Sequence, residues 1–329
     1  MQIAFTCQQY LPSLGTDHFI QKGRATVMQE PTPVPQYPAS PGLVSDHDKQ
    51  PRSPRDSLKL LSFNIQVGIN TQAYHHYVTR SWQHLLPHRQ RNRTLDEIAQ
   101  VLRQYDLVAL QEVDGGSLRS GFVNQVEYLA QSGQFQHWYQ QRNRNLGKLA
   151  QHSNGVLSRI EPSLVEDHPL PGLIPGRGAI VVRLGSGENS LLVIVLHLAL
   201  GVRTQDRQLR YIRELIEHHP HVVLMGDMNN PLEHLLNRPA LQGLGLVSAE
   251  QVMPTYPSWK PTRALDHILI TPSLEMRHAE VLDCTISDHR PIAMEIGLPQ
   301  CLHGLLTAPD VRNGACSSAT AAGAVIIDL

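Results

Sequence analysis

Acidic, amide and imidazole side chains of this sequence gather where short apolar segments end. The set comprises Asn64, Glu112, His197, Asp227, Asn229, Asp266, Asp288 and His289. Carboxylate oxygens bind Mg²⁺, amides orient phosphoryl oxygens, and imidazoles exchange protons or stabilise charge near neutral pH. These residue types are therefore what a hard divalent cation and a phosphate ester would require.

Each of these residues also has a simpler explanation when it is taken alone. Asparagine and aspartate at a strand end are common turn formers and caps, so Asp227 and Asp288 could cap the segments that follow them. Glu112 could merely be exposed. The full set favours catalysis, because turn formation does not require acids, amides and imidazoles together at the same kind of position.

Short apolar runs typical of β-strands carry these residues. The runs occupy residues 58–65, 107–111, 155–157, 179–184, 191–198, 222–225, 265–270 and 292–296. Helical spacing of apolar residues appears between them, at residues 94–105, 123–131 and 205–218. Alternating strands and helices predict two packed sheets flanked by helices, with the polar residues exposed where the strands stop.

The composition indicates one globular domain between two terminal segments that lack its apolar periodic runs. The chain has 329 residues, of which 41% are hydrophobic and 17% charged. Residues 1–57 are rich in proline, which predicts a disordered segment, and residues 300–329 thin to small residues, which predicts a loose tail. The catalytic domain is therefore expected at residues 58–299. A formal charge of −1 excludes a global field that attracts polyanions but not a local basic cleft.

The cysteines and the apolar segments narrow the class of protein further. The four cysteines show no C-x-x-C spacing, which argues against a disulfide framework or a thiolate zinc site. No run approaches the ~18 apolar residues of a membrane helix, and the chain does not start with a basic stretch followed by an apolar block. We therefore expect a cytoplasmic monomer without a transmembrane segment.

Seven runs of the sequence resemble motifs of the endonuclease/exonuclease/phosphatase superfamily, which includes deoxyribonuclease I. In that family's order they are LSFN (61–64), LQEV (110–113), NGVLSR (154–159), HL (197–198), GDMN (226–229), LDHI (265–268) and SDHRP (287–291). The resemblance covers about residues 58–297. The run YPSWKP (256–261), just before Asp266, resembles one that is common in small bacterial members, although it brings no substrate with it. The family resemblance implies an α/β four-layer sandwich, in which two mixed β-sheets pack face to face with helices on both outer sides.

The resemblance also implies a metal site. Glu112 would be the metal-binding glutamate, supported by Asn64 and by Asp288 on the opposite side of the cleft. The metal would be Mg²⁺, with Mn²⁺ as the alternative, and it would polarise the phosphoryl group during one in-line attack by water. No covalent enzyme intermediate is needed.

The remaining members of the set would be catalytic. Asp227 and Asn229 would position the attacking water and a phosphoryl oxygen. Asp266 would orient His289, because a carboxylate on one ring nitrogen fixes the tautomer of the other. His197 completes this group. Whether Asp227 or His289 takes the proton of the water stays open, since the surroundings can tune either residue into that role.

His197 reduces the range of expected substrates. The deoxyribonuclease I, sphingomyelinase and phosphatase branches of the family carry histidine at this position, whereas repair nucleases of the abasic-site type carry tyrosine. Asn154 and Arg177 are candidate substrate contacts, although Arg177 could equally be a turn residue. The insertion at residues 69–93 mixes basic and aromatic residues, which suits a phosphodiester backbone with stacked bases, an anionic lipid headgroup or a plain solvated loop.

The leading hypothesis is a nuclease-like phosphodiesterase whose partner is a phosphate-ester substrate, with nucleic acid as the first candidate. A phospholipid phosphodiesterase of the sphingomyelinase type and a phosphomonoesterase are the alternatives. The contrasting class is a binding module that kept the fold and lost the activity. Every expected catalytic position holds a competent residue type, which argues against that class.

Overall fold

The computed structural model describes residues 56–69, 90–145, 151–172, 176–249, 253–306 and 326–327. Nearly all of the N-terminal segment that is expected to be disordered lies outside the described residues. Most of the insertion at residues 69–93 and most of the C-terminal tail also lie outside them.

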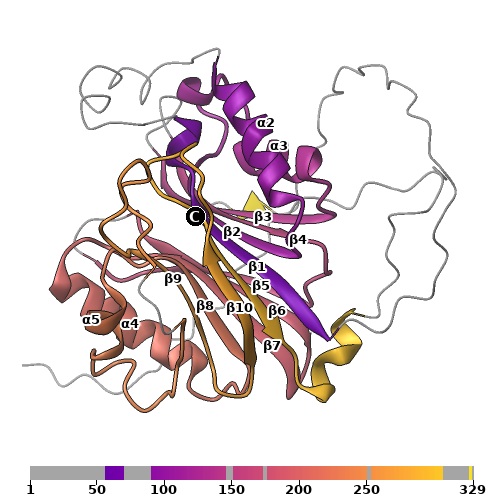
Figure 1. The fold of residues 1–329 in the computed structure, drawn as a ribbon, viewed down its shortest axis with the longest axis vertical. Helices are drawn as coiled ribbons and strands as arrows, with labels where there is room; N and C mark the ends of the chain where they lie inside the picture. Colours follow the sequence, from indigo (N-terminus) through magenta and orange to yellow (C-terminus); the bar gives the residue numbers. More distant parts are fainter. Residues whose placement is uncertain are drawn as a thin grey trace, which may run out of the picture. The chain divides into compact units, whose positions relative to one another are not determined.

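Two β-sheets form the centre of the fold (Figure 1). The first has the strand order β10-β11-β1-β2-β4-β3-β12 and the second the order β5-β6-β7-β8-β9. The strands of the first sheet are β1 (Ser57–Asn64), β2 (Leu107–Asp114), β3 (His137–Asn145), β4 (Gln151–Ser158), β10 (Glu275–Val281), β11 (Ile292–Gly297) and β12 (Ile326–Ile327). Those of the second are β5 (Leu164–Pro169), β6 (Gly178–Ser186), β7 (Asn189–His197), β8 (Val222–Asp227) and β9 (Asp266–Ile270).

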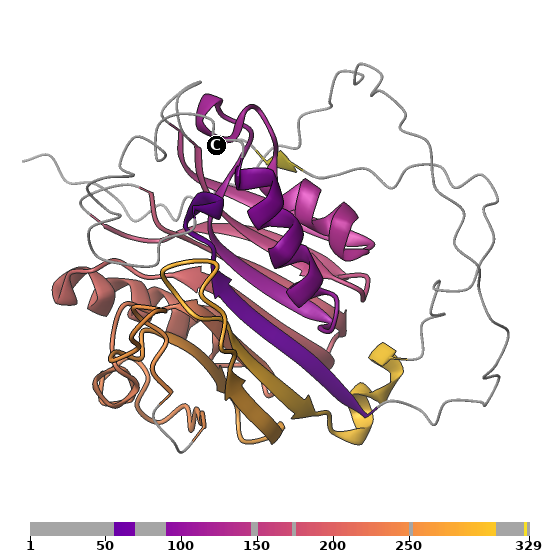
Figure 2. The same cartoon turned by 45° about the horizontal axis from the view of Figure 1, so that its top comes forward.

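Helices cover the outer face of each sheet, which gives four layers (Figure 2). The helices α2 (Gln90–Leu102) and α3 (Gln125–Gly133) pack on the first sheet, and α4 (Val202–Ile216) and α5 (Leu232–Leu236) pack on the second. Short 3-10 helices η1 (Gln66–Gly68), η3 (Leu118–Ser120) and η4 (Gln300–Leu306) lie in the connections. The expected four-layer α/β sandwich with two mixed sheets is confirmed.

The central strands are mostly apolar because most of their residues are buried on both faces of the sheets. In β1, Leu58 and Leu60 face the core between the sheets, whereas Leu61 and Phe63 face the helices α2 and α3. The core between the sheets extends to η4, where Leu302 is only 1% exposed. The packed part of the chain therefore continues beyond residue 299.

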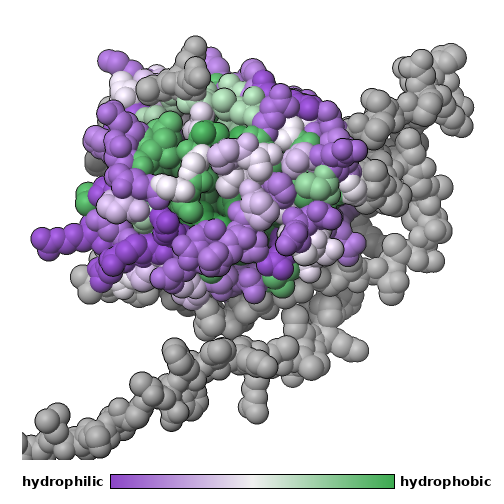
Figure 3. Space-filling model, turned by 90° about the horizontal axis from the view of Figure 1, so that it is seen from below, coloured by the Kyte–Doolittle hydropathy of each residue, from purple (hydrophilic) through white to green (hydrophobic). Residues whose placement is uncertain are grey.

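Large apolar side chains are mostly inside, but a few reach the surface of the described part. Exposed ones are Phe122, Leu200, Val202 and Val247. On the face drawn in Figure 3, apolar residues gather in the middle and hydrophilic residues surround them. None of the described helices is both long enough and apolar enough to cross a membrane.

Candidate active site

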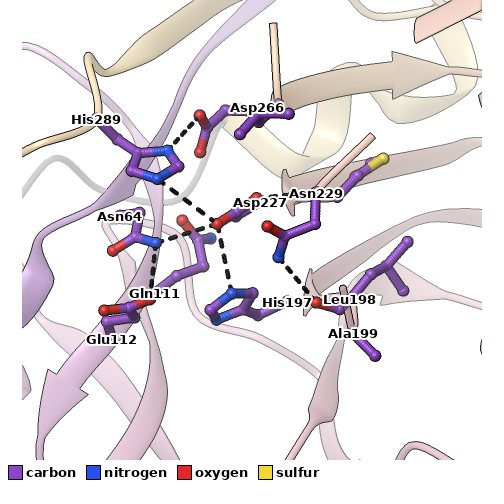
Figure 4. Close-up of polar contacts among 12 residues, drawn as sticks. Asn64, Gln111, Glu112, His197, Leu198, Ala199, Asp227, Asn229, Asp266 and His289 are labelled. Atoms are coloured by element: carbon purple, nitrogen blue, oxygen red, sulfur yellow. Dashed lines mark hydrogen bonds and ion pairs between the residues drawn. The ribbon is translucent and has the colours of Figure 1, made fainter. Parts of the chain in front are cut away.

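The candidate active site lies at the edge of the sandwich where β1, β2, β7 and β8 end. Asn64 is the last residue of β1, and Glu112 lies near the end of β2. His197 and Asp227 end β7 and β8 and pair with each other in register. Because β1 runs parallel to β2 and β7 parallel to β8, residues far apart in the sequence meet at one edge (Figure 4).

Other members of the polar set join this cluster from neighbouring segments. Asp266 begins β9 directly opposite Asp227 in the antiparallel register. Asn229 follows Asp227 by two residues, and Asp288 and His289 lie in the loop before β11. The structure therefore brings the expected catalytic residues to a single edge, where four of them are buried: His197, Asp227, Asp266 and His289.

Unusual backbone conformations direct two of these side chains. Glu112 has a φ of 54° and sits where the pairing of β2 with β4 shifts register between Leu110 and Val113. Asn229 has a φ of 51°. Left-handed backbone is uncommon for residues other than glycine and is concentrated at functional sites. The bulge in β2 turns Glu112 toward the cluster, where Asn64 contacts it.

A glycine allows β7 and β8 to approach closely at their ends. Gly226 has a φ of 149°, and a Cβ atom at this position would overlap the carbonyl oxygen of Leu196. Only glycine tolerates both the conformation and the contact. This close approach lies one residue before the paired His197 and Asp227, so it helps to set the spacing of that pair.

Asp227 is the centre of the polar network (Figure 4). Its Oδ2 accepts a hydrogen bond from Asn64 Nδ2 at 3.1 Å. The same oxygen lies 3.3 Å from His197 Nε2 and 4.0 Å from His289 Nε2. Its Oδ1 accepts from the backbone N–H of Asn229 at 2.9 Å. One buried carboxylate thus meets an amide and both imidazoles.

His289 is held from its far side by Asp266. The distance from His289 Nδ1 to Asp266 Oδ2 is 2.7 Å. This contact places the proton on Nδ1 and turns Nε2 toward Asp227. The second carboxylate oxygen of Asp266, Oδ1, is buried without a hydrogen-bond partner.

The expected metal ligands are linked to one another through a serine. Asn64 Nδ2 donates to Glu112 Oε1 at 3.2 Å. Ser287 Oγ lies 2.8 Å from the carbonyl oxygen of Asn64 and 3.2 Å from Asp288 Oδ1, so it connects the end of β1 to the loop that carries Asp288. These contacts arrange an amide and two carboxylates around one corner of the site.

The donor set fits a hard divalent cation. Burial raises the pKa of Glu112, and the negative charge of Asp288 raises it further, so the two carboxylates lie close enough to repel each other. A second group, formed by Asp227, Asp266 and His289, offers ligand atoms within 4.8 Å of one another. Clustered carboxylates are the environment that a cation stabilises, and in the second group the buried Oδ1 of Asp266 has no hydrogen-bond partner.

The site raises the pKa of Asp227 and lowers the pKa of His197. Burial, together with the nearby charge of Asp266, raises the pKa of Asp227 to about 7. Burial lowers the pKa of His197 well below its ordinary value, and the positive charges of Arg177 and His289 act in the same direction. His197 is therefore neutral at neutral pH, whereas Asp227 exchanges its proton there.

His289 is shifted in the opposite direction. Burial alone would lower its pKa, but the charges of Asp266 and Asp227 outweigh burial and raise the pKa well above the ordinary value. The hydrogen bond from Nδ1 to Asp266 adds to this effect. His289 is therefore positively charged at neutral pH, unlike His197.

The two candidate substrate contacts differ in their surroundings. Burial lowers the pKa of Arg177 and outweighs the attraction to Glu112 and Asp227, which acts in the opposite direction, so this guanidinium is within electrostatic reach of the acidic cluster. Asn154 is buried, and its Nδ2 donates to the carbonyl oxygen of Gly178 at 3.0 Å. Asn154 thus ties the first sheet to β6 beside Arg177, and that bond uses one of its two amide N–H groups.

Two residues of the site environment have no counterpart among the sequence predictions. Thr255 is fully buried and donates to Asp266 Oδ2. The ring of Tyr256 lies 4.9 Å from the ring of His289, centroid to centroid. The run at residues 256–261 was the available signal, because it resembles one common in small bacterial members and lies just before Asp266.

Comparisons with known proteins identify a family and a shared fold. The family model described as "Endonuclease/Exonuclease/phosphatase family" matches residues 61–289. A comparison with curated proteins gives no match. Among solved structures, an endonuclease/exonuclease/phosphatase from Beutenbergia cavernae is 21% identical with a TM-score of 0.56, and the match covers 74% of this chain and 72% of that one.

Two further solved structures have more specific names. A mannosyl-6-phosphatase from Bacteroides thetaiotaomicron is 16% identical with a TM-score of 0.55, over 73% of this chain and 99% of that one. TDP2 from D. rerio, in complex with a single-strand DNA product, is 19% identical with a TM-score of 0.53, over 74% of this chain and 100% of that one. The fold, the ordered site and the matched family model together show that the chain belongs to the endonuclease/exonuclease/phosphatase family.

Proposed function

We propose that the protein is a divalent-metal-dependent phosphoesterase that hydrolyses a phosphodiester by direct attack of water. The observation that carries this proposal is the position of Asp227 Oδ2, which meets Asn64, His197 and His289 at the buried edge of both sheets. Apolar side chains would stabilise the fold at this position at least as well as one carboxylate, an amide and two imidazoles. The polar cluster is therefore better explained by catalysis.

Asn64, Glu112 and Asp288 would hold the cation, Mg²⁺ or alternatively Mn²⁺. Bound there, the ion supplies positive charge that neutralises the phosphoryl oxygens. The hard oxygen donors and the mutual repulsion of Glu112 and Asp288 support this assignment.

Asp227 is proposed to take the proton from the attacking water. A carboxylate whose pKa lies at about 7 is half ionised at neutral pH and is basic enough to accept a proton. The backbone N–H of Asn229 and the amide of Asn64 hold its two oxygens in place. The side chain of Asn229 donates to the carbonyl oxygen of Leu198, which orients its amide at the edge of the site.

His289 is proposed to stabilise the charge that develops on the phosphoryl group. Its Nδ1 is engaged by Asp266, and its raised pKa keeps the Nε2 proton in place for donation. The neutral His197 would fix Asp227 through the contact between Nε2 and Oδ2. Arg177 would contact a non-bridging oxygen, and Asn154 would support the backbone beside it.

The identity of the ester is proposed as a nucleic-acid phosphodiester, with a phosphomonoester and a phospholipid as competitors. A relative named for a mannosyl-6-phosphate and another bound to a DNA product both support phosphate-ester chemistry. Leu200 is 76% exposed and follows His197 by three residues, so an exposed apolar side chain lies in the segment that leaves the end of β7. This position suits either a stacked base or the apolar part of a lipid.

A substrate panel with purified protein and Mg²⁺ tests the proposal. The panel compares single- and double-stranded DNA, RNA, sphingomyelin and inositol phosphates, with wild type beside Asp227→Asn. We expect hydrolysis of at least one phosphodiester by the wild type and a loss of rate of ~10²–10⁴ in the variant. Failure to hydrolyse any ester would favour the binding module, and turnover of monoesters alone would favour the phosphatase.

A further inference from the structure

A short hairpin at residues 255–263 packs against the His289 loop. The backbone N–H groups of Thr255 and Tyr256 both donate to the carbonyl oxygen of Arg263 at 2.9 Å, and Arg263 N donates back to Tyr256 O at the same distance. These bonds close the hairpin on itself. It contains the run of residues 256–261 that resembles one of small bacterial family members, and that run has no assigned role.

Hydrogen bonds join the hairpin to the loop in which Asp288 and His289 lie. Ser258 N donates to the carbonyl oxygen of Asp288 at 2.8 Å, and Ser258 Oγ donates to that of Ser287 at 2.5 Å. In return, Arg290 N donates to Thr255 O at 2.8 Å and Arg290 Nε to Ser258 O at 2.6 Å. The loop is thus fixed on both sides of His289 by one hairpin.

Thr255 connects this hairpin to the catalytic pair. Its Oγ1 accepts the backbone N–H groups of Leu265 and Asp266 at 3.3 and 3.4 Å. A hydroxyl has one proton to donate, and here it is directed to Asp266 Oδ2 at 2.5 Å. The orientation of this hydroxyl is therefore determined by the backbone at the start of β9.

The bond from Thr255 consequently fixes the orientation of the Asp266 carboxylate toward His289. Its Oδ2 accepts from both Thr255 and His289 Nδ1, whereas Oδ1 has no hydrogen-bond partner. Without the hydroxyl of Thr255, the carboxylate would be free to rotate about its Cβ–Cγ bond to intermediate angles, at which neither oxygen lies in line with His289 Nδ1. The ring of Tyr256, 4.9 Å from the His289 ring and tilted by 49°, limits the movement of the imidazole from a second side.

We propose that Thr255 is a positioning residue, whose hydroxyl fixes the rotation of the Asp266 carboxylate and thereby holds His289 Nε2 facing Asp227. This inference deepens the proposed phosphoesterase function and rests on it for its catalytic consequence. The positioning itself concerns only contacts between residues of this chain, so it is measurable without substrate.

The kinetic test uses variants that differ in one hydroxyl. Thr255→Val removes the hydroxyl at nearly constant volume, Thr255→Ala removes it without placing a methyl group against Asp266, and Thr255→Ser retains it. Thr262→Val is the matched control, because Thr262 is exposed on the same hairpin. Mutation of residues that hydrogen-bond to metal ligands typically lowers activity ~10–100-fold. Thr255 supports a catalytic residue in the same way, so we expect kcat to fall by about that factor in Thr255→Val and Thr255→Ala.

The pattern of the losses distinguishes positioning from general damage. We expect KM to stay unchanged, Thr255→Ser to restore most of kcat, and Thr262→Val to behave as the wild type. In an Asp266→Asn background, Thr255→Val should cause no further loss, because Thr255 acts through Asp266. An equal loss in both backgrounds, or no rescue by serine, would overturn the proposal.

A spectroscopic measurement separates this inference from the proposed function. The Nδ1 proton of His289 should give a downfield NMR resonance because of its short bond to Asp266, assigned by its disappearance in Asp266→Asn. We expect the resonance in the wild type, Thr255→Ser and Thr262→Val, and its loss in Thr255→Ala and Thr255→Val. This pattern in a protein that hydrolyses no ester would defeat the proposed function and leave the positioning intact. A resonance unchanged by removal of the hydroxyl would defeat the positioning.

Discussion

His289 Nδ1 lies 2.7 Å from Asp266 Oδ2, although the two residues come from different segments, a loop before β11 and the start of β9. This contact leaves Nε2 directed at Asp227, 4.0 Å away. The contact with Asp266 therefore occupies Nδ1 and leaves Nε2 as the ring nitrogen that is available to a substrate.

Replacement of His289 should abolish most of the activity while sparing the fold. His289→Ala removes the charged imidazole, and a positioned acid or base is typically worth a factor of ~10²–10⁴ in rate. The variant should keep its melting cooperativity, because the side chain contributes no apolar packing to the three core clusters. Steady-state kinetics with a phosphodiester, alongside His278→Ala on the exposed part of β10, checks this expectation. Equal turnover in both variants would remove His289 from the mechanism.

The contribution of Asp227 to the stability of the metal-free protein should fall as pH rises toward neutrality. The pKa of Asp227 is raised from its model-peptide value to about 7 by burial and by Asp266, so between these two values the folded state binds more protons than the unfolded state. The contribution of Asp227 to the slope of the unfolding free energy against pH is therefore negative in this window, and the stability that it adds at acid pH is lost as pH approaches 7. Histidines with lowered pKa values, such as His197, contribute a slope of the opposite sign, so the test is the difference between two proteins. Urea unfolding at several pH values should show a more negative slope in the wild type than in Asp227→Asn, and equal slopes would contradict the shift.

A divalent cation should stabilise the folded protein through Glu112 and Asp288. Binding to the folded state alone raises the melting temperature in a saturable manner. Thermal melts with Mg²⁺ or Mn²⁺ should therefore show a concentration-dependent increase in the wild type, reversed by EDTA. Glu112→Gln and Asp288→Asn should lose the increase, whereas the control Glu275→Gln, an exposed acid on β10, should keep it. An increase of the same size in all four proteins would assign the cation to another site.

Gly226→Ala should destabilise the protein more than an alanine at an open glycine. At Gly226 the new Cβ would overlap the Leu196 carbonyl, and the φ of 149° belongs to a region open essentially to glycine alone. Such backbone strain costs on the order of 1–3 kcal/mol, and the steric overlap adds to it. The control is Gly187→Ala, where φ is 58° but no atom lies within 4 Å. Urea unfolding of both variants measures the difference, and equal free energies of unfolding would show that the overlap is relieved without cost.

The central strands could be predicted from the sequence because their burial is visible as apolar runs. The expected segments at residues 58–65, 107–111 and 222–225 coincide with β1, β2 and β8. The strands β3, β5 and β10 were missed, since each carries many polar side chains. In β3, for example, Gln141 is buried through a hydrogen bond from its amide to the carbonyl oxygen of Ala179. Such tertiary compensation leaves no periodic signal in the sequence.

The candidate site was predictable as a set of residues but not as a network. Motif order suggested that Asn64 and Asp227 belong together, yet their 3.1 Å contact joins residues of opposite sheets. The Thr255 hydroxyl was not predicted because threonine in a turn carries no specific signal, and its importance follows only from the burial of Asp266 beside it. The raised pKa of Asp227 likewise depends on neighbours that the sequence does not place.

The most direct test of the account is the rate at which the purified protein releases p-nitrophenol from bis(p-nitrophenyl) phosphate. The measurement compares Mg²⁺ with EDTA, and the wild type with Asp227→Asn. The account predicts release that requires the metal and that the substitution reduces by ~10²–10⁴. No release by the wild type, or release at the same rate in EDTA, would contradict it.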